Sequence, residues 1–479
     1  MHTHTRLIML VTFVCGFVLI GNAQAPDTMW TRRYGGSGED DGSSVQQTSD
    51  GGYIIAGVTT SFGAGNYDIY LIKTDVHGDT LFSKAFGGGD WDVGHCVQQT
   101  SDGGYIITGQ VNGDVSLIKT DADGNKQWEK IFGGGEEDIG LSLQKTSDGG
   151  YVIAGGTYSF GAGNQDVYLI KTNAFGDTLW TKTFGGSNND IGTSIHQTND
   201  GGYIIVGSTA SFGAGYYDVY LIKTNANGDT LFTKTFGGAI NDVGSSVQQT
   251  NDGGYIVAGS TASFSVGYYD FYLFKTDSSG NILFANTFGR TDDDISSSVQ
   301  QTSDGCYIMA GSTEIFGYNY VYLIKTDANG DTVWTKTIER NSECYSVQQS
   351  NDGGYIIVGS KYSSVGSNYD VYLIKLAPEQ VGVNDENNLA GTFSLAQNYP
   401  NPFNPQTTIS FTVVETRHGV SLRIYNLLGQ EVATLINNEI MQAGRHEIQF
   451  DASRLSSGVY YYRLQAGTFT ETKKMVLMK

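Results

Sequence analysis

The chain has 479 residues, enough for two or three domains or for one repeat array with a satellite domain. Its 65 glycines and 30 tyrosines, with only 5 prolines, argue against a disordered chain and favour an all-β protein with many tight turns. The formal net charge of −21 argues against nucleic acid and anionic membranes as partners, because such a surface repels phosphate groups.

The N-terminus is typical of a signal peptide. Arg6 precedes an apolar run from Leu7 to Ile20, which is too short to span a bilayer. Small residues follow, and they are compatible with cleavage after Ala23 or after Ala25. We therefore expect residues 1–23 to act as a signal peptide for export across the inner membrane.

Seven copies of one sequence unit make up most of the chain. A D-G-G-Y tetrapeptide or a close variant recurs every 46 to 52 residues and ends at Tyr53, Tyr105, Tyr151, Tyr203, Tyr255, Tyr307 and Tyr355. Each copy contains four runs of strand length, two of them almost continuously apolar, as in strands covered on both faces. The D-G-G and T-D-x-x-G-D segments between the runs supply the positive φ angles of hairpin turns. Such repeats are typical of β-propeller blades.

The ends of the array predict how the ring closes. Residues 29–36 match the strand that follows each T-D-x-x-G-D hairpin, whereas the last copy ends at Lys375 without that strand. We therefore expect the N-terminal strand to complete the last blade as its outer strand, which leaves no open end in the array. The predicted fold is an all-β, seven-bladed propeller with four-stranded blades over residues 26–376.

Three motifs recur in the array: F-G-G-x-x-x-D-[VI]-G, D-G-G-Y-I-x-[AV]-G-[ST] and D-[VI]-Y-L-I-K-T-[DN]. On these motifs the chain resembles the SBBP-type β-propeller repeat from about residue 28 to residue 376. The resemblance concerns the fold alone, because propellers serve both as enzymes and as scaffolds.

The composition changes after the array. Residues 377–392 are polar and are predicted to be a linker, and the short alternating runs of residues 393–479 predict a small Ig-like β-sandwich. The motifs N-Y-P-N-P-F-N-P, I-Y-N-L-L-G-Q-E-V and the terminal K-K-M-V-L-M-K resemble the type A C-terminal sorting domain of the type IX secretion system. The resemblance implies a sorting motif made of Asn398, Tyr399, Pro400, Asn401, Pro402, Phe403 and Asn404.

The same resemblance implies a route and a destination. The tail is expected to contact the type IX secretion machinery, and the protein is expected to be secreted or attached to the outer cell surface of a Gram-negative bacterium. Cleavage of the tail after export and its retention both stay open.

An aspartate precedes the first strand in six copies, at Asp40, Asp92, Asp138, Asp190, Asp242 and Asp294. Six carboxylates near a central channel could bind a ligand or recruit a cation. Alternatively, each aspartate caps its own turn by accepting backbone N–H bonds, which we favour because one aspartate in a fixed local context is what a structural rule produces. A second set has the same favoured interpretation and comprises Asp68, Asp114, Asp166, Asp218, Asp270 and Asp370.

Aromatic loops join the two central strands in several copies, whereas copy two has only Gln110 to Gly113 there. Exposed tyrosines beside carboxylates and amides can stack on sugar rings or anchor a protein. The candidate ligand-binding tyrosines are Tyr67, Tyr216, Tyr217, Tyr268 and Tyr269. The loop phenylalanines are expected to turn inward over the blade core, and they are Phe62, Phe160, Phe212 and Phe264.

Catalytic motifs and metal-ligand spacings are not evident in the sequence, so we expect no cofactor, no bound metal and no catalytic residue. The leading hypothesis is a non-enzymatic surface or secreted propeller that recognises glycan or protein through the aromatic loop face. One alternative is an extracellular polysaccharide hydrolase or lyase that uses channel carboxylates, and another is a structural component of the envelope without a small ligand. An enzyme should break the repeat symmetry. Arg290, Glu339, Arg340 and Glu343 are such departures, and sequence drift near the ring closure explains them equally well.

Overall fold

The computed structural model describes residues 24–363 and 368–379. It also describes residues 394–395, 398, 401, 403–413, 419–441, 444–467 and 469–478 of the C-terminal region. The predicted signal peptide and most of the predicted linker lie outside these residues. The chain divides into two compact units, residues 1–380 and 381–479. Within the described ranges, no helix is long and apolar enough to cross a membrane.

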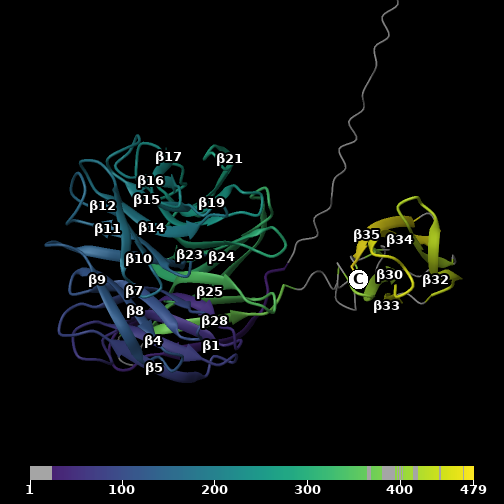
Figure 1. Cartoon of the computed structure of the whole chain (residues 1–479), viewed down its shortest axis with the longest axis horizontal. Helices are drawn as coiled ribbons and strands as arrows, with labels where there is room; N and C mark the ends of the chain where they lie inside the picture. Colours follow the sequence, from purple (N-terminus) through teal and green to yellow (C-terminus); the bar gives the residue numbers. More distant parts are fainter. Residues whose placement is uncertain are drawn as a thin grey trace, which may run out of the picture. The chain divides into compact units, whose positions relative to one another are not determined.

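The first unit is a seven-bladed β-propeller of four-stranded antiparallel sheets (Figure 1). Blades 1 to 3 are β2 (Asp40–Gln47), β3 (Tyr53–Thr59), β4 (Asp68–Thr74) and β5 (Thr80–Phe86); β6 (Val93–Gln99), β7 (Tyr105–Val111), β8 (Asp114–Thr120) and β9 (Lys126–Phe132); and β10 (Asp138–Lys145), β11 (Tyr151–Thr157), β12 (Asp166–Thr172) and β13 (Thr178–Phe184).

Blades 4 to 6 repeat this order from the inner to the outer strand. They are β14 (Asp190–Gln197), β15 (Tyr203–Thr209), β16 (Asp218–Thr224) and β17 (Thr230–Phe236); β18 (Asp242–Gln249), β19 (Tyr255–Thr261), β20 (Asp270–Thr276) and β21 (Ile282–Phe288); and β22 (Asp294–Gln301), β23 (Tyr307–Ile315), β24 (Tyr318–Thr326) and β25 (Thr332–Arg340).

Blade 7 confirms the predicted closure. It consists of β26 (Ser342–Gln349), β27 (Tyr355–Ser363), β28 (Asn368–Leu376) and, as its outer strand, β1 (Thr28–Tyr34). β1 runs antiparallel to β28, with Arg32 opposite Leu373. Across the seam to blade 1, the Gln47 N–H donates to Oε1 of Gln348 at 2.7 Å, and Gln47 Oε1 accepts the Asn351 N–H at 2.8 Å. The first and last sequence copies are therefore joined by strand pairing and by side-chain hydrogen bonds.

The core lies between neighbouring blades. The two central strands of blade 1, β3 and β4, are buried along their whole length, whereas the outer strand β5 is mostly half-exposed or exposed. Tyr53 and Ile55 of blade 1 pack in one cluster with Ile356 and Leu373 of blade 7. The near-continuous apolar runs follow from this stacking, because both faces of a central strand meet another sheet.

A buried lysine fastens each turn between the first and second strands. Gly51 has a φ of 85° in the first of these turns, which favours glycine. Seven ion pairs recur at these turns: Lys73–Asp50, Lys119–Asp102, Lys171–Asp148, Lys223–Asp200, Lys275–Asp252, Lys325–Asp304 and Lys375–Asp352. The lysine of the Y-L-I-K-T motif is thus a structural residue in every blade.

The second unit consists of two antiparallel sheets over one core. One sheet contains β29 (Ser394–Leu395), β30 (Gln406–Val413) and β33 (Gly444–Asp451); the other contains β32 (Glu431–Glu439), β31 (Val420–Tyr425), β34 (Gly458–Ala466) and β35 (Phe469–Leu477). Ile409 and Phe411 of the first sheet pack in one cluster with Leu422 and Tyr462 of the second. The unit is a β domain, and Ig-like topology stays a prediction.

Candidate functional site

The first aspartate set is buried and bound to its own turns. In blade 5, Oδ2 of Asp242 accepts the N–H of Gly238 at 2.7 Å and the hydroxyl of Ser263 at 2.6 Å, and Oδ1 accepts the hydroxyl of Thr261. The other five carry the corresponding bond to a backbone N–H four residues earlier. These are the contacts of a turn cap. Ligand binding by this ring stays a prediction.

The two aspartate sets meet between neighbouring blades. At the junction of blades 5 and 6, a Cβ on Gly289 would lie 2.2 Å from Oδ1 of Asp270 and 2.8 Å from Oδ2 of Asp294, so only glycine fits between the carboxylates. Burial raises the pKa of Asp294, and the charge of Asp270 raises it further. Among the described residues, no group of three or more His, Cys, Asp or Glu side chains could hold a metal ion.

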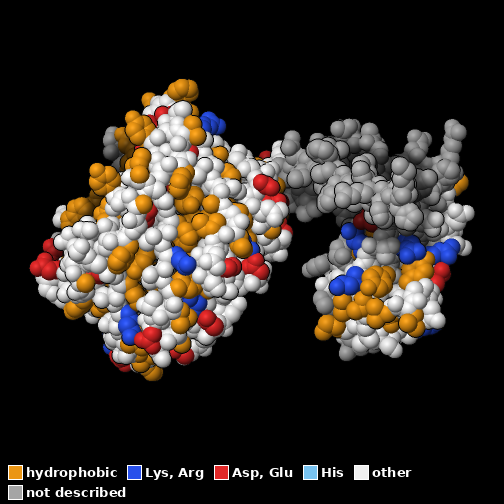
Figure 2. All heavy atoms as spheres, turned by 90° about the horizontal axis from the view of Figure 1, so that it is seen from above, with side chains coloured by type: hydrophobic (Ala, Val, Ile, Leu, Met, Phe, Trp, Pro, Cys, Tyr) orange, Lys and Arg blue, Asp and Glu red, His pale blue; other side chains and the backbone are white. Residues whose placement is uncertain are grey.

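The aromatic loops present the candidate tyrosines in different ways. Tyr67 stacks on Trp91 with ring centroids 4.4 Å apart, and its hydroxyl donates to Glu39 at 2.5 Å. Tyr216 and Tyr268 are 77% and 72% exposed, so both present a free ring face to solvent. Figure 2 shows hydrophobic side chains, tyrosines included, in several separate groups on the visible side of the propeller. The structure thus offers several aromatic contact points.

The loop phenylalanines turn inward only in part. Phe212 rests on buried Tyr220 with centroids 5.7 Å apart, and the same pairing recurs for Phe62, Phe160 and Phe264. Each of the four nevertheless keeps close to half of its surface exposed. They therefore cover the blade and also contribute apolar surface to the loops.

A pocket of about 380 Å³ opens between the loops of blades 3 and 4. It is lined by Asn164, Asn188, Asn189, Ala210, Gly215, Tyr216 and Tyr217. Asn188 is held by its N–H, which donates to Ser211 Oγ at 3.0 Å, and by Nδ2, which donates to the carbonyl of Ala210 at 3.0 Å. Nδ2 of Asn189 donates a hydrogen bond to the Tyr217 hydroxyl at 3.4 Å. The pocket thus combines an exposed aromatic ring with fixed amides, and the sequence prediction had missed the asparagines.

A second site missed from the sequence lies where blades 6, 7 and 1 meet. Oε2 of Glu343 accepts the hydroxyl of Tyr345 at 2.6 Å, and its Oε1 accepts Nδ2 of Asn319 at 2.8 Å. The pKa of nearby Asp41 is raised to about 6, chiefly by burial; a hydrogen bond from Ser360 opposes the shift, and the charges of Glu343 and Glu39 add to it. A half-buried acid with a raised pKa near a second carboxylate is suited to proton transfer.

A break in the repeat signals this acidic pair. Copies two to six carry only Val93, Ile139, Ile191, Val243 and Ile295 where copy one has Asp41 and copy seven has Glu343. In the sequence Glu343 stands out as a departure from the repeat, whereas Asp41 does not, because it follows the repeated Asp40.

In the C-terminal unit, the described part of the predicted sorting motif is anchored to the core sheet. Asn398 is buried, its N–H donates to the hydroxyl of Tyr462 at 2.8 Å, and Oδ1 of Asn401 accepts the N–H of Val476 at 2.8 Å. Phe403 is buried and bonded through its backbone to β35, whereas Asn404 is exposed. Tyr399, Pro400 and Pro402 lie outside the described residues.

Comparisons with known proteins bear on both units. Residues 397–478 match the family described as the secretion system C-terminal sorting domain. A 177-residue segment is 27% identical to a regulatory protein FlaEY of Caulobacter vibrioides; the match covers 32% of this chain and 18% of that protein's length.

Among solved structures, the chain is similar to a protein of unknown function from Bacteroides caccae (15% identity, 59% of this chain and 93% of that one, TM-score 0.37). It is also similar to Sqt1 of Chaetomium thermophilum (11% identity, 74% and 98%, TM-score 0.45). A third similar structure is an endo-1,5-α-L-arabinanase of Thermotoga petrophila (12% identity, 74% and 100%, TM-score 0.32).

The chain is thus a β-propeller followed by a C-terminal sorting domain of type IX secretion. It is therefore a protein secreted by, or attached to the surface of, a Gram-negative bacterium, and its tail interacts with the type IX secretion machinery. The SBBP type of the repeat and the signal peptide stay predictions.

Proposed function

We propose that this exported propeller is a binding protein that recognises a carbohydrate at its aromatic loop face, in the pocket between blades 3 and 4. The observation that carries the proposal is the exposed ring of Tyr216 beside the amides of Asn164, Asn188 and Asn189. A sugar ring has an apolar face of C–H groups and an edge of hydroxyls. The tyrosine matches the face, and amides donate to and accept from the hydroxyls.

The size and charge of the pocket support the same ligand class. Its volume of about 380 Å³ falls in the range of small-molecule pockets, roughly 300 to 1,000 Å³. Its lining residues carry no charge, so a neutral saccharide can enter without losing ion pairs. Tyr268 on the next blade is similarly exposed, so a longer glycan could meet a second aromatic contact along the rim.

A glycan array with the exported full chain tests the proposal, followed by titration calorimetry with the best glycan. We expect Tyr216→Ala to weaken binding by more than about tenfold, because the ring supplies the largest apolar contact. Phe175→Ala is the matched control, since Phe175 is 73% exposed but lies in an outer hairpin of blade 3. Absence of glycan binding, or equal binding by Tyr216→Ala and the parent, would contradict the proposal.

A polysaccharide hydrolase is the second candidate, and the acidic pair Asp41 and Glu343 favours it. The raised pKa of Asp41 suits a general acid and Glu343 a base or nucleophile, as in glycoside hydrolysis. Reducing-end release from polysaccharides would be measured for the parent, Asp41→Asn and Glu343→Gln. Hydrolysis that both substitutions abolish would establish the enzyme, whereas glycan binding without turnover would leave the binding function.

A further inference from the structure

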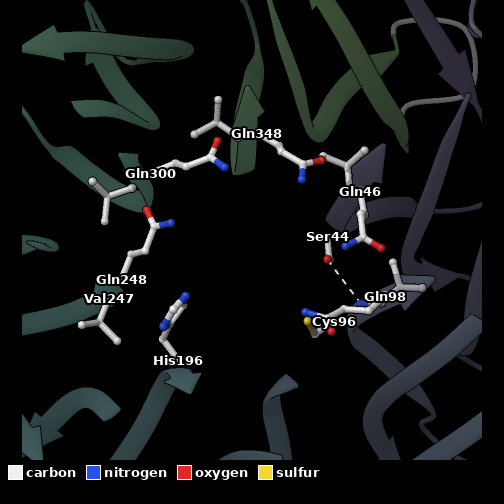
Figure 3. A pocket seen from close by; sticks show the side chains of 13 residues that line it. Ser44, Gln46, Cys96, Gln98, His196, Val247, Gln248, Gln300 and Gln348 are labelled. Carbon is white, nitrogen blue, oxygen red and sulfur yellow. Dashed lines mark hydrogen bonds between the residues drawn. The ribbon is translucent and has the colours of Figure 1, made fainter. Parts of the chain in front are cut away.

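A layer of amide side chains surrounds the central channel at the end away from the aromatic loops. The inner strand of each blade begins at the loop face and reaches this layer at its sixth or seventh residue, as β2 does at Gln46. Six blades contribute a glutamine: Gln46, Gln98, Gln144, Gln248, Gln300 and Gln348. His196 takes the seventh place, in blade 4. Figure 3 shows five of these glutamines and His196 arranged around an open centre.

Hydrogen bonds to the next blade fix the orientation of each amide. Oε1 accepts a backbone N–H of the following inner strand, at distances of 2.6 Å for Gln46, 2.9 Å for Gln98, 2.7 Å for Gln248, 2.6 Å for Gln300 and 2.7 Å for Gln348. Gln144 makes the same bond to the N–H of Gln197. Because a backbone N–H can only donate, the oxygen must face the neighbouring blade and the NH₂ group must face the channel.

The next glutamine along the strand shows what a fully satisfied amide looks like in this fold. Oε1 of Gln99 accepts the N–H of Ser49 at 2.8 Å, and its Nε2 donates to the carbonyl of Gly103 at 3.5 Å. The same double bonding recurs at Gln197, Gln249 and Gln301. In the channel layer, by contrast, no acceptor for Nε2 occurs among the residues that the structure describes. The layer therefore presents hydrogen-bond donors toward one small space.

Two departures from the repeat place other nitrogen-bearing side chains at this end of the inner strands. His196 replaces a channel glutamine in blade 4, and its buried Nδ1 has no hydrogen-bond partner among the described residues. Lys145 replaces the adjacent glutamine in blade 3, and its Nζ donates to the carbonyl of Gln99. The acidic side chains of the turns that directly follow the inner strands, Asp50 and its six repeats, are each paired with one of the buried lysines described above.

We propose that this end of the channel binds a small oxyanion, held by the converging NH₂ groups of the glutamine layer. The ligand class is an inorganic oxyanion or a carboxylate, because it must accept hydrogen bonds on several sides. Hydrogen bonds to a charged acceptor are shorter and stronger than bonds between neutral groups, so neutral amides suffice when several converge. The pocket of about 220 Å³ has room for such an ion with one or two waters. This site is separate from the glycan pocket.

Calorimetry on the exported full chain with sodium sulfate, sodium phosphate and sodium acetate, each against sodium chloride at equal ionic strength, tests the proposal. Saturable binding of one of the first two identifies an inorganic oxyanion, and saturable binding of acetate identifies a carboxylate. Side-chain NH₂ resonances of the uniformly ¹⁵N-labelled protein, assigned through Gln46→Glu and Gln348→Glu, should shift in the same titration. Absence of saturable binding by all three anions overturns the proposal, without reliance on any binding variant.

Substitutions then locate the site. Gln248→Glu combined with Gln300→Glu keeps the oxygen that accepts the interblade N–H but replaces the donor with a negative oxygen, so affinity should fall by more than about tenfold. His196→Gln completes the amide ring and should retain binding. The control with equal added charge is Gln127→Glu combined with Asn227→Asp, both exposed and outside the channel. If the channel pair binds as tightly as this control, the anion lies elsewhere and the proposal is wrong.

Discussion

Neutralising Asp41 should stabilise the propeller at neutral pH. Burial, reinforced by Glu343 and Glu39, raises the pKa of Asp41 from 3.8 to about 6. The folded state therefore binds this proton more tightly than the unfolded state does. The resulting stability is fully present below pH 3.8 and is lost as the pH rises through about 6. A shift of about two pKa units corresponds to roughly 3 kcal/mol, and the partial exposure of the group reduces this to about 2 kcal/mol.

Asp41→Asn mimics the protonated acid at every pH. Urea unfolding followed by tryptophan fluorescence isolates the propeller, because all five tryptophans lie at or before Trp334. We expect the variant to be about 2 kcal/mol more stable than the parent at pH 8 and equal to it within about 0.5 kcal/mol at pH 4. Exposed Asp123→Asn is the control and should change neither value. A variant no more stable than the parent at pH 8 would refute the burial argument.

Three further predictions concern the repeat architecture. Asp200→Ala should cost about 1 to 3 kcal/mol in urea unfolding because it strips buried Lys223 of its carboxylate, whereas Lys223→Met should cost less, since Asp200 stays hydrated. Deletion of residues 24–34 should expose the edge of β28 and yield oligomers in size-exclusion chromatography with light scattering, and deletion of residues 24–27 alone should not. Four turn aspartates have pKa values lowered to about 2: Asp102, Asp148, Asp252 and Asp304. Their ionised forms favour the folded state above pH 3.8, and this stability is lost as the pH falls toward 2. Circular dichroism should therefore show unfolding in this range, and unchanged spectra at about pH 2 would contradict the prediction.

The fold was predictable because the same turn motifs recur between the strands of every copy. Each D-G-G-Y marks one turn between strands, and seven copies fix the number of blades. The unmatched strand before Tyr34 fixes the closure, since a four-stranded blade lacks only that element. Local turn chemistry and strand pattern agree in every copy, which is the condition under which sequence reasoning succeeds.

The bonds between blades were not predictable in the same way. Nothing in V-Q-Q-T tells which glutamine reaches the next blade and which binds its own turn, because both choices depend on side-chain direction at a β-bulge. In β2 the bulge lies between Gly42 and Ser44 and changes the alternation of side chains ahead of Gln46 and Gln47. Similarly, nothing in Y-L-I-K-T indicates that its lysine pairs with the turn aspartate of the same blade, as Lys73 does with Asp50.

The site was predictable only in part, for a related reason. Tyr216 and Tyr217 stand out as aromatics in a loop, but the asparagines that complete their pocket come from the preceding blade and the connection after it. Asp41 and Glu343 are three hundred residues apart in sequence and become neighbours only through ring closure. Contacts across blades carry no short-range pattern, so a single sequence shows the residues and not their partners.

Repetition itself separates the structural residues from the functional candidates. The capping aspartates and the turn lysines recur in nearly every blade, because each blade must solve the same packing problem. Two pairs of residues occur once each in the array: Asp41 with Glu343, and His196 with Lys145. They replace residues that the other blades use for packing or for hydrogen bonds between blades. The charge of Asp41 destabilises the fold at neutral pH. A residue that costs stability and has no repeat counterpart is most simply explained by a task that the scaffold does not perform.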